Sequence, residues 1–188
     1  QPRGKHGKIR SQMATTLMDA HRTGKVRAAI GRASDVFGPG VVYSMAGAGI
    51  FRSALAGKAA SSLGDLDTPH TYTFNRDYAK ALVTLGTREE AMGQIWHVPN
   101  AETLTTRQFV ELVFEEVGTA PRFHVPRGLT LNLLTLISPA MRQLRREKIF
   151  QFEATFIVDH GKYERTFGAE TTPHGEAIRQ TLDWFRIR

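Results

Sequence analysis

A polar pair followed by a rigid turn is the first feature of this sequence that could bind a ligand. Ser34 and Asp35 come shortly after the apolar run Val26–Ile30, and Gly38-Pro39 follows them. The run predicts a buried strand. A hydroxyl and a carboxylate at the carboxyl end of a parallel strand lie where α/β folds bind their ligands. The same residue types also form Asx turns, so the stretch has a purely structural interpretation as well.

Several other kinds of reactive site are not supported by the residue pattern. The chain has no cysteine, which excludes disulfides and thiolate metal sites. Its seven histidines show no His-x-x-x-His spacing and no neighbouring carboxylate cluster, so we expect no metal site. No Gly-x-Ser-x-Gly segment is present, which argues against an esterase nucleophile.

The charge distribution narrows the classes of partner. The net charge is +7, but residues 1–32 hold eight Lys and Arg and one acid, whereas the rest of the chain holds 17 residues of each sign. No aromatic residue is interleaved with the basic ones, so we expect a solvated basic segment and no nucleic-acid binding. The apolar stretch Leu129–Ile137 is shorter than the about 20 residues that span a bilayer. Without a secretory signal or a membrane span, we expect a cytoplasmic protein.

Helices and short strands alternate along the chain. Helices are predicted at 8–23, 75–86, 105–117 and 128–148 and after Thr172, and strands at 26–30, 71–74, 95–98 and 123–125. Thr105 and Gln108 have capping-box spacing, while Asn75 and Thr172 are expected to cap the helices that follow them. The alternation predicts an α/β fold.

Four stretches, in this order, resemble the extended short-chain dehydrogenase/reductases, also called NAD-dependent epimerase/dehydratases. "GRASDVFGPG" is similar to that family's Arg-x-x-Asn-x-Tyr-Gly-Pro segment. The other three are "GDLDTPHTYTFNRDYAKALV", "GQIWHVPNAETLTTRQFVELVFEEVG" and "DHGKYERTFGAETTPHGEAIRQTLDWF". The resemblance implies the carboxy-terminal portion of a Rossmann-type parallel sheet fold with a smaller α/β substrate domain. Residues 1–45 would complete the NAD(P)-binding domain, and 46–188 would be mainly substrate domain, with 67–100 returning to the Rossmann sheet.

The chain departs from the family where the cofactor pyrophosphate is bound. The family's Gly-x-x-Gly-x-x-Gly turn brings the pyrophosphate onto a helix amino terminus. Here Gly4 and Gly7 have the first spacing, but the third position is Arg10. Because the sequence also begins with Gln1 and not with Met, we expect the amino-terminal part of the nucleotide domain to precede it.

The second departure concerns the family's reactive Tyr-x-x-x-Lys pair. Alignment back from Arg32 places Lys8 at the lysine and Gly4 at the tyrosine. In the family the lysine lowers the pKa of the phenol and the tyrosine moves a proton while hydride passes to or from the nicotinamide. Glycine cannot move a proton, so the catalytic residue is unknown and Lys8 is the candidate that remains.

The resemblance also implies which other residues contact ligands. The expected cofactor-binding residues are Lys8, Ser34, Asp35 and Pro39, and the expected substrate-binding residues are Tyr72 and Asp35. Arg32 is expected to anchor the strand end, and Asp77 to cap or pair near the start of its helix.

These expectations lead to two functional hypotheses. The first is a fragment of an NAD- or NADP-dependent oxidoreductase that acts on a nucleotide-sugar-like or other hydroxylated small molecule. The missing tyrosine keeps open a second, a non-catalytic NAD(P)-binding sensor or partner-binding protein of the same fold. Turnover of a sugar nucleotide favours the first, and cofactor binding without turnover favours the second. The sequence does not decide whether the protein forms a homodimer.

The isolated 188-residue chain is expected to bind NADH and NADPH weakly, because the pyrophosphate turn is not in the sequence. Titration calorimetry measures this directly. Micromolar binding of either cofactor by the isolated chain would contradict it.

Overall fold

The computed structural model describes residues 4–62, 64–125, 136–139, 142 and 151–187. The helices are α1 (Gly4–Arg22), α2 (Ala48–Leu55), α3 (Asn75–Thr87), α4 (Thr106–Val117), α7 (Gly161–Phe167) and α8 (His174–Arg186), with a short 3₁₀ helix η1 (Glu89–Ala91). The strands are β1 (Ile30–Arg32), β2 (Asp35–Phe37), β3 (Ala60–Ser61), β4 (Pro69–His70), β5 (Tyr72–Phe74), β6 (Ile95–His97), β7 (Leu104–Thr105) and β8 (Phe123–His124). The α/β prediction is confirmed. Most of the helix predicted at 128–148, and most of the apolar stretch 129–137, lie outside the described residues.

The strand predicted at 26–30 begins only at Ile30 and continues, with one break, to Phe37. β1 pairs in parallel with β6, and β2 pairs in parallel with β5. The chain therefore changes its strand partner between Arg32 and Asp35. Asp35, which was expected to precede the turn at Gly38-Pro39 as part of a polar pair, is the first residue of β2 and pairs with Tyr72. A further parallel pair joins β3 to β8, and β4 pairs antiparallel with β7.

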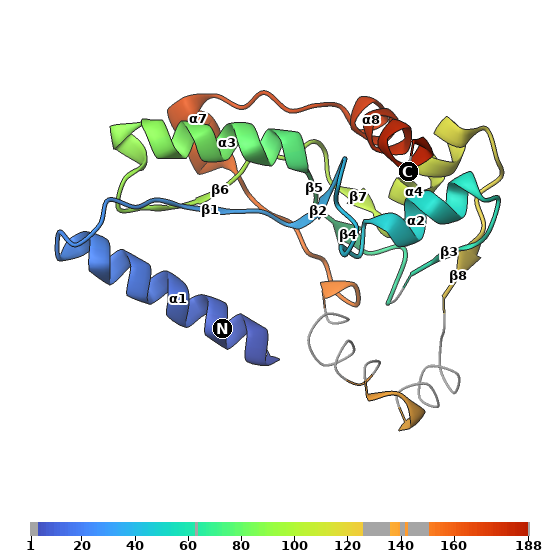
Figure 1. Cartoon of the computed structure of the whole chain (residues 1–188), viewed down its shortest axis with the longest axis horizontal. Helices are drawn as coiled ribbons and strands as arrows, with labels where there is room; N and C mark the ends of the chain where they lie inside the picture. Colours follow the sequence, from blue (N-terminus) through green and yellow to red (C-terminus); the bar gives the residue numbers. More distant parts are fainter. Residues whose placement is uncertain (1–3, 63, 126–135, 140–141, 143–150, 188) are drawn as a thin grey trace.

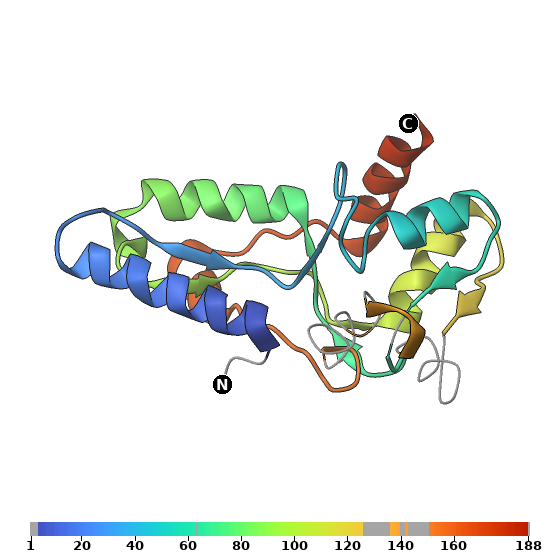
Figure 2. The ribbon, with the colours of Figure 1, turned by 60° about the horizontal axis from the view of Figure 1, so that its bottom comes forward.

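The β1–β6 pair lies between two helices, α3 on one side and α1 on the other (Figures 1 and 2). The α3 side is tightly packed, since a Cβ added to Gly31 would lie 2.8 Å from the Leu82 Cδ2 atom. The α1 side is loose, and no residue of α1 is buried. Ile9, Met13 and Leu17, whose spacing predicted this helix, are 45%, 65% and 37% exposed. The prediction of the helix was right, but these residues do not form a packed face among the described residues.

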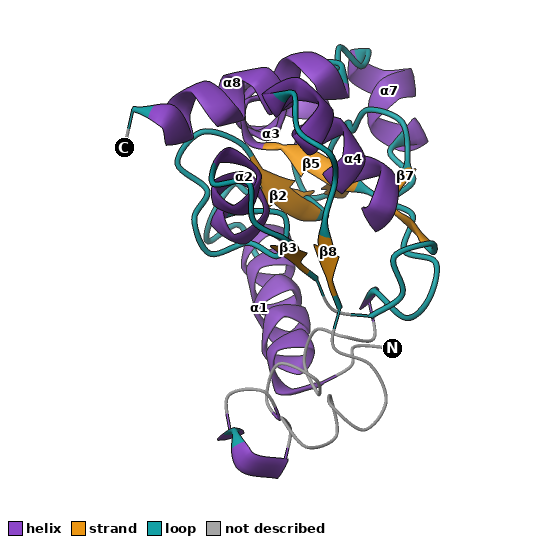
Figure 3. Cartoon of the chain, turned by 90° about the vertical axis from the view of Figure 1, so that its right-hand side faces the viewer, coloured by secondary structure: helices purple, strands orange, loops and turns teal. Residues whose placement is uncertain are grey.

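Two groups of buried side chains stabilise the fold. The larger lies where α2, α4 and α8 gather around β2 and β5 (Figure 3). Its centre is Phe37, whose ring meets that of Phe109 edge-on with 5.0 Å between centroids. The smaller group surrounds Trp96, beneath α3 and α7. None of the helices in the part of the chain that the structure describes is both long and apolar enough to cross a membrane.

The capping box predicted for α4 is present. The Thr105 hydroxyl accepts a hydrogen bond from the Gln108 backbone N–H at 3.1 Å, and the Gln108 side chain accepts one from the Thr105 N–H at 2.8 Å. Gly118 ends the helix in the left-handed conformation, with φ of 78°. These signals act within one helical turn, which is why the sequence was sufficient to place this helix.

The two other predicted caps are wrong, because tertiary partners compete for the same side chains. Asn75 is the first residue of α3, and its amide donates to the Pro39 carbonyl oxygen at 2.8 Å. Thr172 donates its hydroxyl to the Asp77 carboxylate at 2.8 Å, and its backbone N–H donates to the same carboxylate at 2.7 Å. The prediction that Asp77 pairs near its helix start is confirmed.

The turn after β2 depends on a glycine. Gly38 has φ of 137°, and a Cβ there would lie 2.0 Å from the Asn75 side-chain oxygen. We expect Gly38→Ala to lower the free energy of unfolding by roughly 3 kcal/mol or more, through both backbone strain and this overlap. Gly40→Ala is the matched control, since Gly40 has φ of 84° but a Cβ added there would meet no atom within 4 Å. The free energies of unfolding are measured by urea denaturation. If the two variants lose equal amounts, the contact with Asn75 is unimportant.

The carboxylate of Asp77, which is buried, ties α3 to the segment that leads into α8. Asp77→Asn removes the negative charge and replaces one of the two acceptor oxygens that face Thr172 with an N–H donor, so we expect a loss of about 1–3 kcal/mol in unfolding free energy. Asp183→Asn is the control, because it weakens only an exposed ion pair with Arg186 and should cost less than about 1 kcal/mol. If the two variants unfold at the same denaturant concentration, the structural role of Asp77 is refuted.

Candidate functional site

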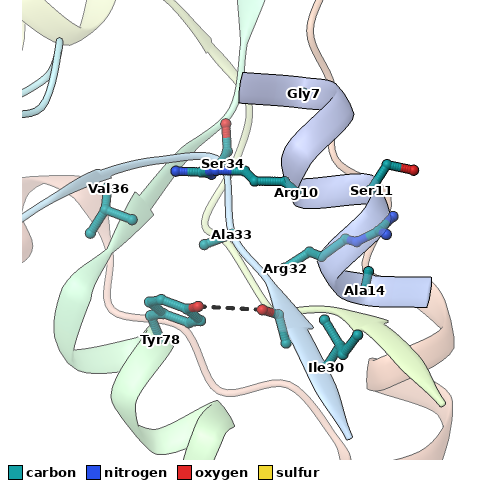
Figure 4. A pocket seen from close by; sticks show the side chains of 11 residues that line it. Gly7, Arg10, Ser11, Ala14, Ile30, Arg32, Ala33, Ser34, Val36 and Tyr78 are labelled. Carbon is teal, nitrogen blue, oxygen red and sulfur yellow. Dashed lines mark hydrogen bonds between the residues drawn. The ribbon is translucent and has the colours of Figure 1, made fainter. Parts of the chain in front are cut away.

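A cavity of about 740 Å³ lies between α1 and the strand formed by β1 and β2 (Figure 4). It is lined by Gly7, Arg10, Ser11 and Ala14 of α1, by residues 30–34 and Val36 of the strand, and by Tyr78 of α3. The α1 residues share one face, because their spacing follows the helical repeat. The volume is in the range of small-molecule sites, and the cavity lies at the carboxyl end of β1, where α/β folds bind their ligands.

The break between β1 and β2 is fixed by a chain of buried and partly buried hydrogen bonds. The Ser34 N–H donates to the Thr73 hydroxyl oxygen at 3.0 Å, and the Ser34 hydroxyl donates to the Thr71 carbonyl oxygen. The Thr73 hydroxyl in turn donates to the Asn100 side-chain oxygen. Thr71, Thr73 and Asn100 are all buried. Ser34 is therefore held rigidly at the cavity wall, as a residue that orients a ligand must be.

The Asp35 carboxylate contacts a side chain that the sequence pattern did not indicate. Its carboxylate lies 2.9 Å from Nε2 of His70, a side chain that is 1% exposed. The His70 ring stacks on Phe152 with 4.4 Å between centroids. Asp35 was predicted to contact both cofactor and substrate, yet the structure places it outside the cavity lining, on a buried histidine. No local signal indicated this pair, because the two residues are 35 positions apart.

Tyr72 is placed in the core. It is 2% exposed, its ring stacks on Phe109 with 4.3 Å between centroids, and its hydroxyl donates to the Thr106 hydroxyl at 2.9 Å. Burial raises the pKa of Tyr72 above its usual value, so the phenol stays protonated and keeps donating. Tyr72 does not line the cavity, and its contacts are those of a packing residue.

Lys8 and Pro39 also lie outside the lining. Lys8 is exposed on α1, one residue away from the lining position Gly7. Pro39 is half-buried, and its carbonyl oxygen accepts the hydrogen bond from Asn75 in the turn after β2. Of the residues predicted for cofactor or substrate binding, only Ser34 is brought to the cavity.

Two arginines and a tyrosine line the cavity although they had not been predicted for the site. Arg10 extends from α1 to beside Ser34, and Arg32 extends from β1 towards α1 (Figure 4). Arg32 thus lines the cavity where it was expected only to anchor the strand end. The Tyr78 hydroxyl donates to the Gly31 carbonyl oxygen at 3.3 Å. One signal for the α1 face was present, since Gly7, Ser11 and Ala14 repeat small residues at helical spacing.

The lining residues fit one end of a nicotinamide cofactor but not its middle. Small residues on both walls leave room for a flat ring beside the backbone, and Ser34 and Tyr78 supply fixed hydroxyls. The described residues contain no glycine turn of the kind that holds a pyrophosphate. The same residues include no group of three or more His, Asp or Glu that could bind a metal ion.

Comparison with known proteins gives matches at the level of structure only. No protein-family model matches the sequence, and no curated protein matches it by sequence. An epimerase of Methanothermobacter thermautotrophicus superposes with a TM-score of 0.72 and 17% identity, over 92% of this chain and 47% of that one. The dTDP-glucose 4,6-dehydratase of Bacillus anthracis, in complex with NAD, gives 0.74 and 14%, over 100% of this chain and 53% of that one.

The UDP-glucose 4-epimerase of Thermotoga maritima, solved with UDP-glucose, matches with a TM-score of 0.71 and 18% identity, over 96% of this chain and 53% of that one. The chain thus spans about half the length of these structures. The predicted resemblance is confirmed for the fold. The chain has the Rossmann-type α/β fold of the NAD-dependent epimerases and dehydratases, over about half of their length.

Proposed function

We propose that this chain forms the nicotinamide and substrate side of an NAD(P)-dependent oxidoreductase that acts on a nucleotide-sugar-like or other hydroxylated small molecule. The observation that carries the proposal is the cavity at the carboxyl end of β1, with Ser34 held at its wall. Support also comes from the solved proteins of this fold, of which one is a complex with NAD and another a complex with UDP-glucose.

Each wall of the cavity would have a distinct task. When bound, the cofactor supplies the hydride chemistry. Gly31 and Ala33 would let the nicotinamide ring approach the strand backbone, and Ser34 would orient the groups beside it. Lys8, which is exposed on α1 beside the lining residue Gly7, would have to extend around the helix to reach a ribose hydroxyl.

Proton transfer needs a group other than the missing tyrosine. Position 4 is glycine, so a hydroxyl substrate must give its proton to another side chain or to water, and a ketone substrate must take one from there. Among the described residues, Tyr78 is the phenol that lines the cavity. Its hydroxyl already donates to the Gly31 carbonyl oxygen, so it can act only if a substrate oxygen replaces that acceptor.

The absent tyrosine favours a second candidate, a protein that binds NAD(P) without turning over a substrate. The two are separated by measuring oxidation of NAD(P)H, or reduction of NAD(P)+, with a panel of sugar nucleotides and the whole protein. Turnover supports the enzyme, and cofactor binding with no turnover supports the sensor.

Cofactor placement is tested by ¹⁵N NMR of the isolated chain with NADH at concentrations up to about 10 mM, where millimolar affinities are still observed. We expect amide shifts in Gly7–Ala14 and Gly31–Ser34. Residues of α4 and α8 serve as the internal control and should not shift. No shifts at the highest concentration, or shifts confined to α4 and α8, would overturn the proposed function.

A further inference from the structure

The face of α1 that is turned towards the strand pair ends at a histidine. Among the partly covered positions of α1, four repeat at helical spacing and share this inner face, namely Gly7, Ala14, Met18 and His21. Gly7 and Ala14 line the cavity, and His21 follows Ala14 by two helical turns. The inner face of α1 therefore extends from the cavity wall to His21.

The His21 ring lies at the junction where the strand pair begins. Its Nδ1 atom accepts a hydrogen bond from the Ala28 backbone N–H at 3.2 Å. The ring also lies against the turn before β6, since a Cβ added to Gly93 would be 2.6 Å from its Nε2 atom. The Gly93 N–H in turn donates to the Ala28 carbonyl oxygen at 2.8 Å. The end of α1 is thus attached to the starts of β1 and β6, which come together at the left of Figures 1 and 2.

The direction of this hydrogen bond fixes the protonation state of the ring. A backbone N–H is always a donor, so Nδ1 of His21 must carry a lone pair, and the ring is neutral with its hydrogen on Nε2. An imidazolium has an N–H on both nitrogens and no acceptor. Protonation of His21 would therefore place two N–H groups opposite each other and break its bond to Ala28.

His97 on β6 shows the opposite arrangement. Its Nδ1 atom lies 3.0 Å from the carbonyl oxygen of Asp159. A carbonyl oxygen only accepts, so Nδ1 of His97 carries a hydrogen in both the neutral and the protonated ring. Acid leaves this contact intact, and His97 is therefore the natural control for His21.

The charged groups on the elements around His21 are exposed, and most are paired with one another. They are Asp19 with Arg22 on α1, Lys25 in the connection to β1, Arg27 with Glu89, and Arg88 with Glu90. The hydrogen bond from Arg88 lowers the pKa of Glu90. Exposed carboxylates of this kind stay ionised down to about pH 5.5, so histidine is the side chain whose charge changes between there and neutral pH.

We propose that His21 makes the position of α1 depend on pH: the neutral ring holds the end of α1 on the strand pair, and the protonated ring releases it, which widens the cavity. No residue of α1 is buried, so hydrophobic packing does little to oppose this movement. The inference concerns the wall of the cavity and holds for any ligand. Only its consequence, weaker NAD(P) binding in acid, rests on the proposed function.

The test uses the 188-residue chain without ligand, at about pH 7.5 and about pH 5.5. Because the chain has no cysteine, Met13→Cys and Val83→Cys place spin labels only at these exposed positions of α1 and α3. Pulsed EPR then measures the distance between the helices on the two sides of the strand pair. ¹⁵N NMR of the imidazole rings shows whether Nδ1 of His21 carries a hydrogen, and amide exchange reports on the Ala28 N–H.

Three variants separate the titration of His21 from its packing. In His21→Asn the side-chain oxygen can accept from the Ala28 N–H, but it does not titrate. In His21→Phe the ring remains and the acceptor is lost. His97→Asn is the matched control, since it removes another histidine of the same strand pair and keeps His21. Thermal unfolding of each variant checks that it is folded.

At the higher pH we expect wild type to have a bare Nδ1 on His21 and a single label distance. At the lower pH, Nδ1 should gain a hydrogen, the label distances should lengthen and broaden, and the protection of the Ala28 amide should fall about tenfold, as loss of one hydrogen bond predicts. His21→Asn should keep the short distance at both pH values, and His21→Phe should show the longer ones at both. His97→Asn should respond like wild type.

The inference is overturned by a hydrogen on Nδ1 of His21 at the higher pH, by an unchanged label distance in wild type at the lower pH, or by a pH response that persists in His21→Asn. If His21→Phe does not fold, the comparison of wild type with His21→Asn still decides. Failure of the proposed function does not affect these readouts, because no sample contains a ligand, and the NADH titration tests that function separately.

Discussion

The rest of the structure depends on how one strand changes its partner. β1 is bonded to β6, and its last carbonyl, that of Arg32, still accepts from the Val98 N–H at 2.9 Å. Two residues later the Ser34 N–H is bonded to the Thr73 side chain, and β2 then continues along β5. A side-chain hydroxyl thus satisfies a backbone group that neither ladder can satisfy, as buried backbone donors require. Without this junction the strand would have to end, and the cavity wall would end with it.

The same strand joins the two groups of buried side chains. Ala29 and Ala33 pack against the group around Trp96, while Phe37 lies at the centre of the larger group. The strand is therefore anchored by hydrophobic burial at both ends and by hydrogen bonds at the break between them. This explains why the cavity can have one rigid wall although α1, its other wall, has no buried residue. A ligand in the cavity would contact a fixed surface on one side and an adjustable one on the other.

The sequence could predict those features that are encoded within a few residues. The capping box of α4 is such a local pattern, and it is present in the structure. The caps assigned to Asn75 and Thr172 failed, since both side chains are used by partners 36 and 95 residues away. The helix α2 was not predicted, although its buried residues Ile50, Phe51 and Ala54 have helical spacing. The fold itself came from the order of several weak motifs, and no single physical signal within the chain would have been enough to predict it.

The cavity residues show where prediction from the sequence has its limit. Ser34 was found because it follows a predicted strand, but Arg10 and Arg32 were not, since nothing in the sequence places a helix face opposite a strand end. The apolar stripe of α1 was the stronger local signal, and it pointed to a different face from the one that lines the cavity.

The site depends on where the fold places the charged residues. Counted along the chain, the basic residues of positions 1–32 have the pattern of a solvated segment. Two of them, Arg10 and Arg32, line the same cavity because α1 lies along β1, and both remain exposed. A net charge thus says little about a partner until the fold shows which of the charges face the same space.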